Sequence, residues 1–385
     1  MSMSSSRYSP WWMPAVCILL LLVCIVLFYS LAFKTVTRNM SVSPIAGTDS
    51  GLMPKTAYTW NLVTSWPENF PGLGTAPENF AKLVNEMSHG RLVIDVHGAN
   101  AIVPALGVFD AVSSGSVEMG HSAAYYWKGK IAASPFFTSV PFGMNAQEYN
   151  GWLHYGGGLA LWREIYAPFN LIPFAGGNTG VQMGGWFNKE INTIDDIREL
   201  KMRIPGLGGE VFSRAGGVAV NIAGSELYTS LQSGVVDAAE WVGPYNDLAF
   251  GFHQIAKYYY YPGWQEPGPA LEFIINKQAY EQLPIDLQKI VEVATRAINQ
   301  DMMDEYSQRS AGALKELRDV HDVDIRVFPK DVLAAYREAA ISVYNEYAKN
   351  DPVFNKVYTS YFSYLYAAKE YSEISEQAYY ENRNR

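Results

Sequence analysis

Between residues 58 and 240, short segments with a strand pattern alternate with short segments that have a helical period. This alternation limits the possible folds of the chain more than any other feature of the sequence. Leu92–Val96 is one expected strand, and the apolar residues between Phe80 and Met87, just before it, recur at helical spacing. Strands that alternate with helices form parallel or mixed sheets with covered faces. The pattern therefore predicts an α/β protein.

The pattern changes after residue 283, where long helices are expected at about 286–318 and 332–347, with one strand between them. A chain of 385 residues is also too long for one compact core. We therefore expect a two-lobed clamshell with mixed sheets, similar to periplasmic binding proteins, that closes by hinge motion around a ligand. The expected boundaries are 57–178 for lobe I, completed by 269–330, then 179–268 for lobe II and 331–385 for a C-terminal helical segment.

The N-terminus has a different character, because residues 15–33 contain no charged side chain. A helix of about 20 apolar residues is needed to span a bilayer, so this run is just long enough. We interpret residues 1–33 as a signal peptide or a membrane anchor, and residues 34–56 as a linker. Both alternatives place the rest of the chain outside the cytoplasm. Cys17 and Cys24 are the only cysteines and lie within the run, so the body contains no disulfide.

The charge balance argues against a nucleic-acid partner. The chain has 29 basic and 38 acidic residues, a net charge of -9. Sequence-independent binding of nucleic acids needs a basic face that neutralises phosphates.

One short motif raises the alternative of an enzyme. Gly120-His121-Ser122-Ala123-Ala124 nearly matches the nucleophile elbow of serine hydrolases, in which the serine lies on a sharp turn between a strand and a helix. That reaction also needs an acid and a histidine later in the chain, and none of the later histidines lies in a glycine-rich loop. A hydrolase that uses Ser122 is therefore the alternative from another class. The spacing of the histidines does not match a zinc site, and the Gly206–Gly209 segment does not match a phosphate-binding loop.

The first expected helix has a sequence signal at its start. Thr75 precedes Pro77 and lies three residues before Glu78, the spacing of a capping box. We expect Thr75 to be the N-cap. A similar signal, Asp351 followed by Pro352, predicts the start of a last, tyrosine-rich helix.

Polar side chains with the chemistry of ligand binding occur in three segments rich in glycine and aromatic residues. They surround Gln182, Arg203 and Glu240. Arg203 ends an expected strand, where ligands of α/β sheets commonly bind, and a guanidinium holds a carboxylate with two parallel hydrogen bonds. The alternative for Arg203 is a surface ion pair with Asp195 or Glu199.

Long motifs in the same order resemble the substrate-binding subunits of TRAP (tripartite ATP-independent periplasmic) transporters, of the DctP type, in the branch that binds 2-oxo acids. The resemblance runs from about Trp60 to Asn276 and is looser to about Phe328. It depends on FPGLGT, PALGVFDAVSSG, EMGHSAAYYW, FFTSVPFGM, GNTGVQMGGWF, KMRIPGLGGEV, DAAEWVGPYNDL and KYYYYPGWQEPGP.

The resemblance implies a receptor outside the cytoplasm that is not an enzyme and delivers a small carboxylate, held with a cation, to a membrane permease. It implies that Arg203 binds the carboxylate. It further implies that Gln182 and Glu240 ligate the cation through side-chain oxygens and Trp241 through its backbone carbonyl. Further residues are expected to line the cleft or contact the ligand: Trp66, Tyr125, Tyr126 and Asn178. For Asn178, a turn-forming role is the alternative.

An amide oxygen, a carboxylate and a peptide carbonyl are hard ligands that suit Na⁺ or Ca²⁺ rather than zinc. Arg203, Glu240, a monovalent cation and a monocarboxylate together have no net charge, which favours Na⁺ slightly unless another acid lies nearby. A pyruvate-like 2-oxo acid is the expected ligand, and a lactate-like 2-hydroxy acid bound with calcium is the alternative. The resemblance also allows a homodimer formed through the C-terminal helix.

Overall fold

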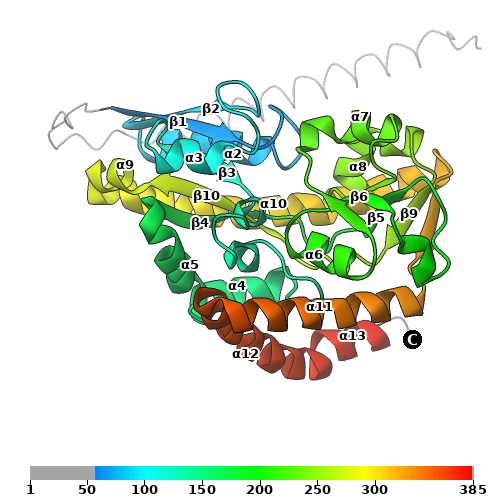
Figure 1. The fold of residues 1–385 in the computed structure, drawn as a ribbon. Coiled ribbons are helices and arrows are strands. Elements are labelled where there is room, and N and C mark those ends of the chain that lie inside the picture. Colours follow the sequence, from blue (N-terminus) through cyan, green and yellow to red (C-terminus); the bar gives the residue numbers. More distant parts are fainter. Residues whose placement is uncertain (1–56, 384–385) are drawn as a thin grey trace, which may run out of the picture. The chain divides into compact units, whose positions relative to one another are not determined.

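The computed structural model describes residues 57–383. The predicted leader, 1–33, and linker, 34–56, lie outside these residues. Within 57–383, no helix is both long enough and apolar enough to cross a membrane. Figure 1 shows the arrangement of the helices and strands.

Five strands form the first sheet, in the order β2-β1-β3-β10-β4. β1 is parallel to β2 and β3, whereas β10 is antiparallel to β3 and β4, so the sheet is mixed as predicted. β10 comes about 90 residues after β4 in the chain, yet it is inserted between β3 and β4. The strands of this sheet are β1 (Tyr58–Thr64), β2 (Leu92–His97), β3 (Met119–Ser122), β4 (Leu171–Asn178) and β10 (Ala270–Asn276).

Six shorter strands form the second sheet, in the order β11-β9-β5-β8-β6-β7. It is also mixed, because β5 is antiparallel to β8 and β9, while β6 is parallel to β7 and β8. Its strands are β5 (Gly185–Phe187), β6 (Lys201–Arg203), β7 (Val218–Val220), β8 (Ala238–Ala239), β9 (Tyr258–Tyr261) and β11 (Asp324–Val327).

β11 differs from the sequence-based assignment. It lies within the range 269–330 that was expected to complete lobe I, but it pairs in parallel with β9 of the second sheet. The physical reason is that the long helix α10 (Ile285–Asp319) carries the chain from the first sheet to the second before β11 begins. The other lobe boundaries remain predictions.

Short helices cover the sheets, as the alternating pattern predicts. They are α2 (Thr75–Met87), α3 (Val108–Ser113), α4 (Ala146–Tyr155), α5 (Gly158–Tyr166), α6 (Gly206–Arg214), α7 (Leu227–Gln232), α8 (Pro244–Phe250) and α9 (Lys277–Gln282). The predicted capping box of α2 is wrong. Gly74 is the N-cap, without a side-chain cap, because the Glu78 carboxylate accepts a hydrogen bond from the amide of Asn69 instead (2.8 Å).

Long helices dominate the C-terminal third, which confirms the predicted change of pattern. α10 contacts α2 and β4 on one side of the molecule and α8 on the other, so it bridges the two sheets. α11 (Lys330–Asn350) packs against α6 and α12 (Pro352–Ile374), and α12 packs against α4 and α5. α13 (Glu376–Asn382) ends the described chain. The predicted cap of α12 is confirmed, because the Asp351 side chain accepts hydrogen bonds from two amides of its first turn.

A candidate carboxylate and cation site

Arg203 is the last residue of β6, and its side chain is fully buried. Its Nη1 donates to a carboxylate oxygen of Glu240 (2.9 Å) and to the backbone carbonyl of the same residue (2.8 Å), while its Nε donates to the carbonyl of Ile222 (3.1 Å). Glu240 is equally buried and follows β8, the strand beside β6. The alternative of a surface ion pair with Asp195 or Glu199 is therefore wrong, because Arg203 is buried beside Glu240 and Asp195 pairs with Arg198.

Aromatic side chains from both sheets enclose the guanidinium. Tyr126 follows β3 of the first sheet, and its hydroxyl accepts a hydrogen bond from Arg203 Nη2 (3.2 Å). The guanidinium carbon lies 5.3 Å from the centre of the Trp241 ring. Trp66, from the loop after β1, packs its ring edge-on against Trp241 at 6.1 Å. The predicted residues Trp66, Tyr126, Arg203 and Trp241 are thus brought together where the two sheets meet.

Three buried side-chain oxygens near Arg203 have no hydrogen-bond partner: Gln182 Oε1, Glu240 Oε1 and Glu266 Oε2. Within residues 57–383, the backbone carbonyl of Trp241 also accepts no hydrogen bond, although the residue is buried. Leaving buried polar groups unpaired is costly, so a cluster of such oxygens points to a ligand that pairs with them. An amide, two carboxylates and a peptide carbonyl are the oxygen donors that Na⁺ and Ca²⁺ prefer. The residues therefore fit a hard cation.

Gln182, Trp241 and Glu266 border a small cavity of about 10 Å³, close to the space that one water molecule needs. Its walls combine aromatic and apolar side chains with the polar groups of the cluster. The lining residues are Trp66, Leu73, Tyr125, Thr179, Gln182, Trp241, Val242, Glu266, Pro269 and Leu271.

Burial sets the protonation chemistry of the cluster. It raises the pKa of Glu240, although the neighbouring Arg203 opposes the shift. It also raises the pKa of Glu266 well above its ordinary value, and the negative charge of Glu240 adds to that shift. Burial alone would lower the pKa of Arg203, but the neighbouring Tyr126, Glu240, Tyr125 and Glu266 together raise it by more, so the guanidinium stays charged. A bound cation would favour the ionised form of both carboxyl groups.

Asn178 uses its side chain within the protein. Its Nδ2 donates to the carbonyl of Gly268 (3.0 Å), and its Oδ1 accepts a hydrogen bond from the amide of Gly180 (2.8 Å), two residues further on. The second contact is an Asx-turn, which agrees with the turn-forming alternative. Contact between Asn178 and a ligand stays a prediction.

The structure does not contain the nucleophile elbow that the hydrolase alternative requires. Ser122 is the last residue of strand β3, is fully buried, and shares a hydrogen bond with the hydroxyl of Ser65 (2.6 Å). The adjacent His121 is held by Trp66 and by the carbonyl of Gly176, and burial lowers its pKa to about 4. Because Ser122 is fully buried at the end of its strand, it lacks the exposed turn that nucleophilic attack requires.

Glu266 is the residue that sequence reasoning missed. It lies in the loop between β9 and β10, and its backbone carbonyl accepts a hydrogen bond from the amide of Gln182 (3.1 Å). The sequence feature that could have identified Glu266 is an acid next to a tryptophan and a proline, Trp264-Gln265-Glu266-Pro267, within the motif KYYYYPGWQEPGP.

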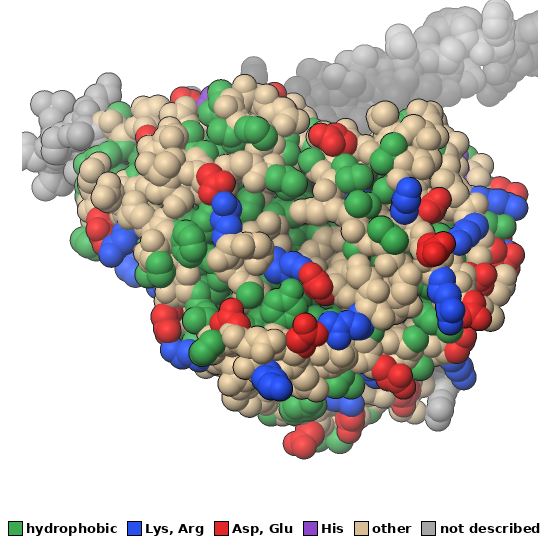
Figure 2. Space-filling model, in the orientation of Figure 1, with side chains coloured by type: hydrophobic (Ala, Val, Ile, Leu, Met, Phe, Trp, Pro, Cys, Tyr) green, Lys and Arg blue, Asp and Glu red, His purple; other side chains and the backbone are tan. Residues whose placement is uncertain are grey.

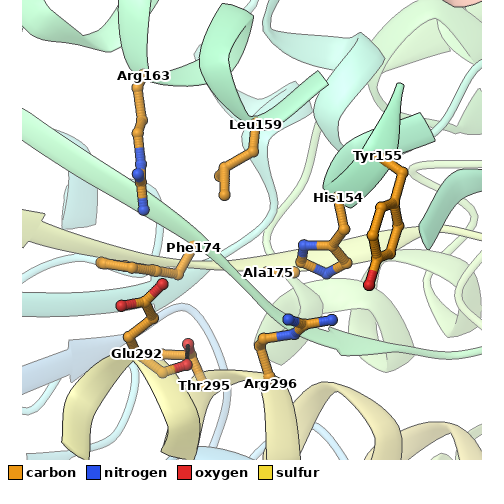
Figure 3. Close-up of a pocket in the computed structure, with 9 residues that line it drawn as sticks. All are labelled: His154, Tyr155, Leu159, Arg163, Phe174, Ala175, Glu292, Thr295 and Arg296. Atoms are coloured by element: carbon orange, nitrogen blue, oxygen red, sulfur yellow. Dashed lines mark hydrogen bonds between the residues drawn. The ribbon is translucent and has the colours of Figure 1, made fainter. Parts of the chain in front are cut away.

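A second pocket, of about 230 Å³, lies away from this cluster, among α4, α5, β4 and α10 (Figure 3). Arg163 points towards the ring of Phe174, and Arg296 lies beside His154. Within the described chain, no lining residue of this pocket has a buried polar side-chain atom without a partner. On the face drawn in Figure 2, acidic and basic side chains are interspersed. The unpaired oxygens beside Arg203 therefore remain the candidate site.

A buried ion pair, a cluster of unpaired oxygens and an aromatic enclosure between two mixed sheets define a ligand-binding protein. The chain belongs to the DctP family, described as bacterial extracellular solute-binding protein, family 7, whose model matches residues 62–350. Proteins of this family are receptors rather than enzymes, so the hydrolase alternative is wrong. The family also places the protein outside the cytoplasm.

Individual relatives are similar over most of their length. A protein of Nostoc sp. described as a monocarboxylate 2-oxoacid-binding periplasmic protein is 42% identical over 320 residues, which are 83% of this chain and 87% of the relative. A TRAP periplasmic solute-binding protein from Pseudoalteromonas atlantica, solved with bound sodium and pyruvate, is 48% identical with a TM-score of 0.83. One from Colwellia psychrerythraea, with bound calcium and pyruvate, is 46% identical with the same TM-score. Each structural match covers 85% of this chain and 99% of the other.

Proposed function

We propose that this protein is the solute receptor of a TRAP transporter and binds a small 2-oxo monocarboxylate, such as pyruvate, together with a cation. The observation that carries the proposal is the set of unpaired buried oxygens next to the charged group of Arg203. An anion alone would not pair with these acceptors. A cation beside a carboxylate satisfies both the acceptors and the guanidinium.

In this proposal the oxygens of Gln182, Glu240, Glu266 and the Trp241 carbonyl hold the cation. A 2-oxo acid has two adjacent oxygens, one on the carboxylate and one on the keto group, which complete the coordination of the ion. Arg203 binds the carboxylate. The rings of Trp66 and Tyr126 exclude water, which lowers the local dielectric constant and strengthens these ionic contacts. The relatives solved with pyruvate and either sodium or calcium support this assignment.

Glu266 changes the charge balance that the sequence suggested. If Glu266 is protonated, Na⁺ with a monocarboxylate leaves the buried group neutral, as before. If Glu266 is ionised, Ca²⁺ gives the neutral combination instead. Because uncompensated buried charge is costly, the protonation state of Glu266 would select between the two ions.

Titration calorimetry with wild-type protein tests the proposal. Pyruvate is titrated into protein freed of Na⁺ and Ca²⁺, and the titration is repeated after each ion has been restored separately. We expect strong binding only when one of the ions is present. Equal affinity with and without the ions would contradict the cation site. If lactate binds more tightly than pyruvate with calcium, the 2-hydroxy acid alternative replaces the 2-oxo acid.

The receptor role further implies that the predicted lobes close around the ligand and that the closed form docks on a membrane permease. Contacts between elements of the two sheets support closure. Arg203 bonds to Tyr126, Asn246 donates to the carbonyl of Pro71 (2.8 Å), and Lys128 forms an ion pair with Glu210. Small-angle scattering with and without pyruvate and cation would detect the change in radius. Anchoring by residues 1–33 remains part of the proposal.

A homodimer through the C-terminal helices is the remaining part of the proposal. Side chains of α12 and α13 expose large apolar or aromatic groups, namely Tyr366, Tyr371, Ile374, Tyr379 and Tyr380. Light scattering of the wild type and of Ile374→Glu tests this. A dimer that the substitution dissociates supports the interface, and a wild-type monomer contradicts it.

A further inference from the structure

We infer that Asp247 is a positioning residue for the cation site: it fixes the peptide group whose carbonyl belongs to Trp241. The inference depends on the proposed function, because it assigns a role within the same site. Asp247 lies in α8, six residues beyond Trp241, and its side chain is buried.

The contacts of Asp247 divide between its two oxygens. Oδ1 accepts hydrogen bonds from the amides of Val242 (3.3 Å) and Gly243 (3.1 Å). Oδ2 accepts hydrogen bonds from the indole of Trp186 (2.9 Å) and the hydroxyl of Tyr259 (2.7 Å). The rings of Trp186 and Tyr259 stack 4.1 Å apart on the neighbouring strands β5 and β9. One oxygen is thus held by the second sheet, and the other oxygen holds the loop.

The bond to Val242 acts on the cation site through the geometry of the peptide. The amide of Val242 and the carbonyl of Trp241 belong to one planar peptide group, which is trans. In a trans peptide the N–H and the C=O point in opposite directions. When Asp247 holds the N–H on one side, the carbonyl of Trp241 must face the other side, away from the carboxylate. This is the carbonyl that no hydrogen bond within residues 57–383 uses.

The next peptide group of the loop is fixed in the same way. Asp247 holds the amide of Gly243, and the carbonyl of that peptide, from Val242, accepts a hydrogen bond from the amide of Met183 (3.0 Å). Met183 directly follows Gln182, another proposed cation ligand. Asp247 therefore sets the orientation of two consecutive peptides, and the second connects the Trp241 loop to the Gln182 segment.

Glu272 provides a matched control elsewhere in the molecule. Its buried carboxylate accepts hydrogen bonds from the indole of Trp127 and the hydroxyl of Tyr166, the same two donor types that bind Asp247 Oδ2. Unlike Asp247, it accepts no hydrogen bond from a loop amide of the cation site. Asp247→Ala and Glu272→Ala each leave one indole and one phenol unpaired, but only the first releases the peptides that follow Trp241.

The experiment measures cation affinity by calorimetry, with pyruvate at saturating concentration and calcium chloride or sodium chloride as titrant. In Asp247→Ala we expect the cation dissociation constant to rise at least about tenfold, the cost typical of losing a residue that orients a metal ligand. In Glu272→Ala we expect the cation dissociation constant to change by less than about threefold. This holds even if the melting temperature of Glu272→Ala falls by as much as that of Asp247→Ala. Equal changes in the two variants would overturn the inference.

Hydrogen exchange in the wild type gives a second test that needs no variant. The amides of Val242 and Gly243 should be protected in the folded protein without pyruvate or cation, because Asp247 already holds them. Exchange of both amides at the rate of an unstructured loop would overturn the inference. The proposed function fails separately, if the wild type binds pyruvate without any dependence on the cation.

Discussion

Arg203 binds Glu240 twice, through one carboxylate oxygen and through the backbone carbonyl, and leaves the second carboxylate oxygen free. The arginine therefore neutralises the acid without using all of its capacity. If hydrogen-bond donors occupied both carboxylate oxygens of a buried acid, neither oxygen would be free to bind a cation. This partial pairing allows one residue to serve both an ion pair and a metal site.

Replacing Arg203 by alanine should abolish most of the affinity for pyruvate. The loss should be about 2–5 kcal/mol, because the ligand carboxylate would be buried without a partner. Arg203→Lys keeps the charge but not the planar fork, so it should recover only part of the affinity. Calorimetry with pyruvate and a saturating cation measures both variants. Near-native binding by Arg203→Ala would contradict the role of this side chain.

Glu266→Gln should change which ion the protein prefers. The substitution keeps one oxygen as a ligand but removes a negative charge, which matters more for a divalent ion. We expect calcium affinity to fall at least about tenfold and sodium affinity to fall less, since each step of 1.4 kcal/mol is tenfold. Thermal shifts in parallel series of calcium and sodium chloride, with pyruvate constant, report the ratio. An unchanged ratio would remove Glu266 from the cation site.

Cation affinity should fall as the solution becomes more acidic. Burial raises the pKa of Glu240 to about 8 and also raises the pKa of Glu266, so protons compete with the cation for both groups. The cation binds the ionised forms, and its binding therefore releases protons. The dissociation constant of the cation, measured at several pH values between about 6 and 8, should decrease as the pH rises. In Glu266→Gln the dependence should be shallower, because one competing group is absent.

The sequence predicted the parts of the molecule that depend on local pattern. The mixed α/β class, the long helices after residue 283 and the Asp351 cap follow from periodicity and from side chains close in the chain. The insertion of β10 between β3 and β4 depends on pairing between distant segments, which no local pattern encodes.

The candidate site was also predicted only in part from the sequence. Arg203, Gln182, Glu240 and Trp241 were identified through motif resemblance, and the structure brings them together. Glu266 was missed because its nearness to Gln182 arises from a backbone contact between segments about 84 residues apart. The Thr75 cap was predicted wrongly because Glu78 instead bonds to Asn69 in a loop whose shape the sequence pattern does not reveal.

Glu272 should make the stability of the protein depend on pH, independently of any ligand. Burial raises its pKa to about 7 in the folded state, although Trp127 and Tyr166 both donate to it. Below the unfolded-state pKa, the acid is protonated in both states and does not change the free energy of unfolding. As the pH rises from there through the folded-state pKa, the acid lowers the free energy of unfolding. A shift of this size corresponds to about 3 kcal/mol, lost between about pH 4.5 and 7.

Glu272→Gln isolates this contribution. The amide keeps an oxygen to accept from Trp127, and its NH₂ group can donate to the hydroxyl of Tyr166, so the hydrogen bonds survive without the charge. Urea unfolding of the wild type and the variant, at pH values between about 4.5 and 8, gives the difference in unfolding free energy. That difference should move in favour of the variant as the pH rises, by about 3 kcal/mol over the range. A difference that stays constant with pH would show that Glu272 does not change its ionisation on folding.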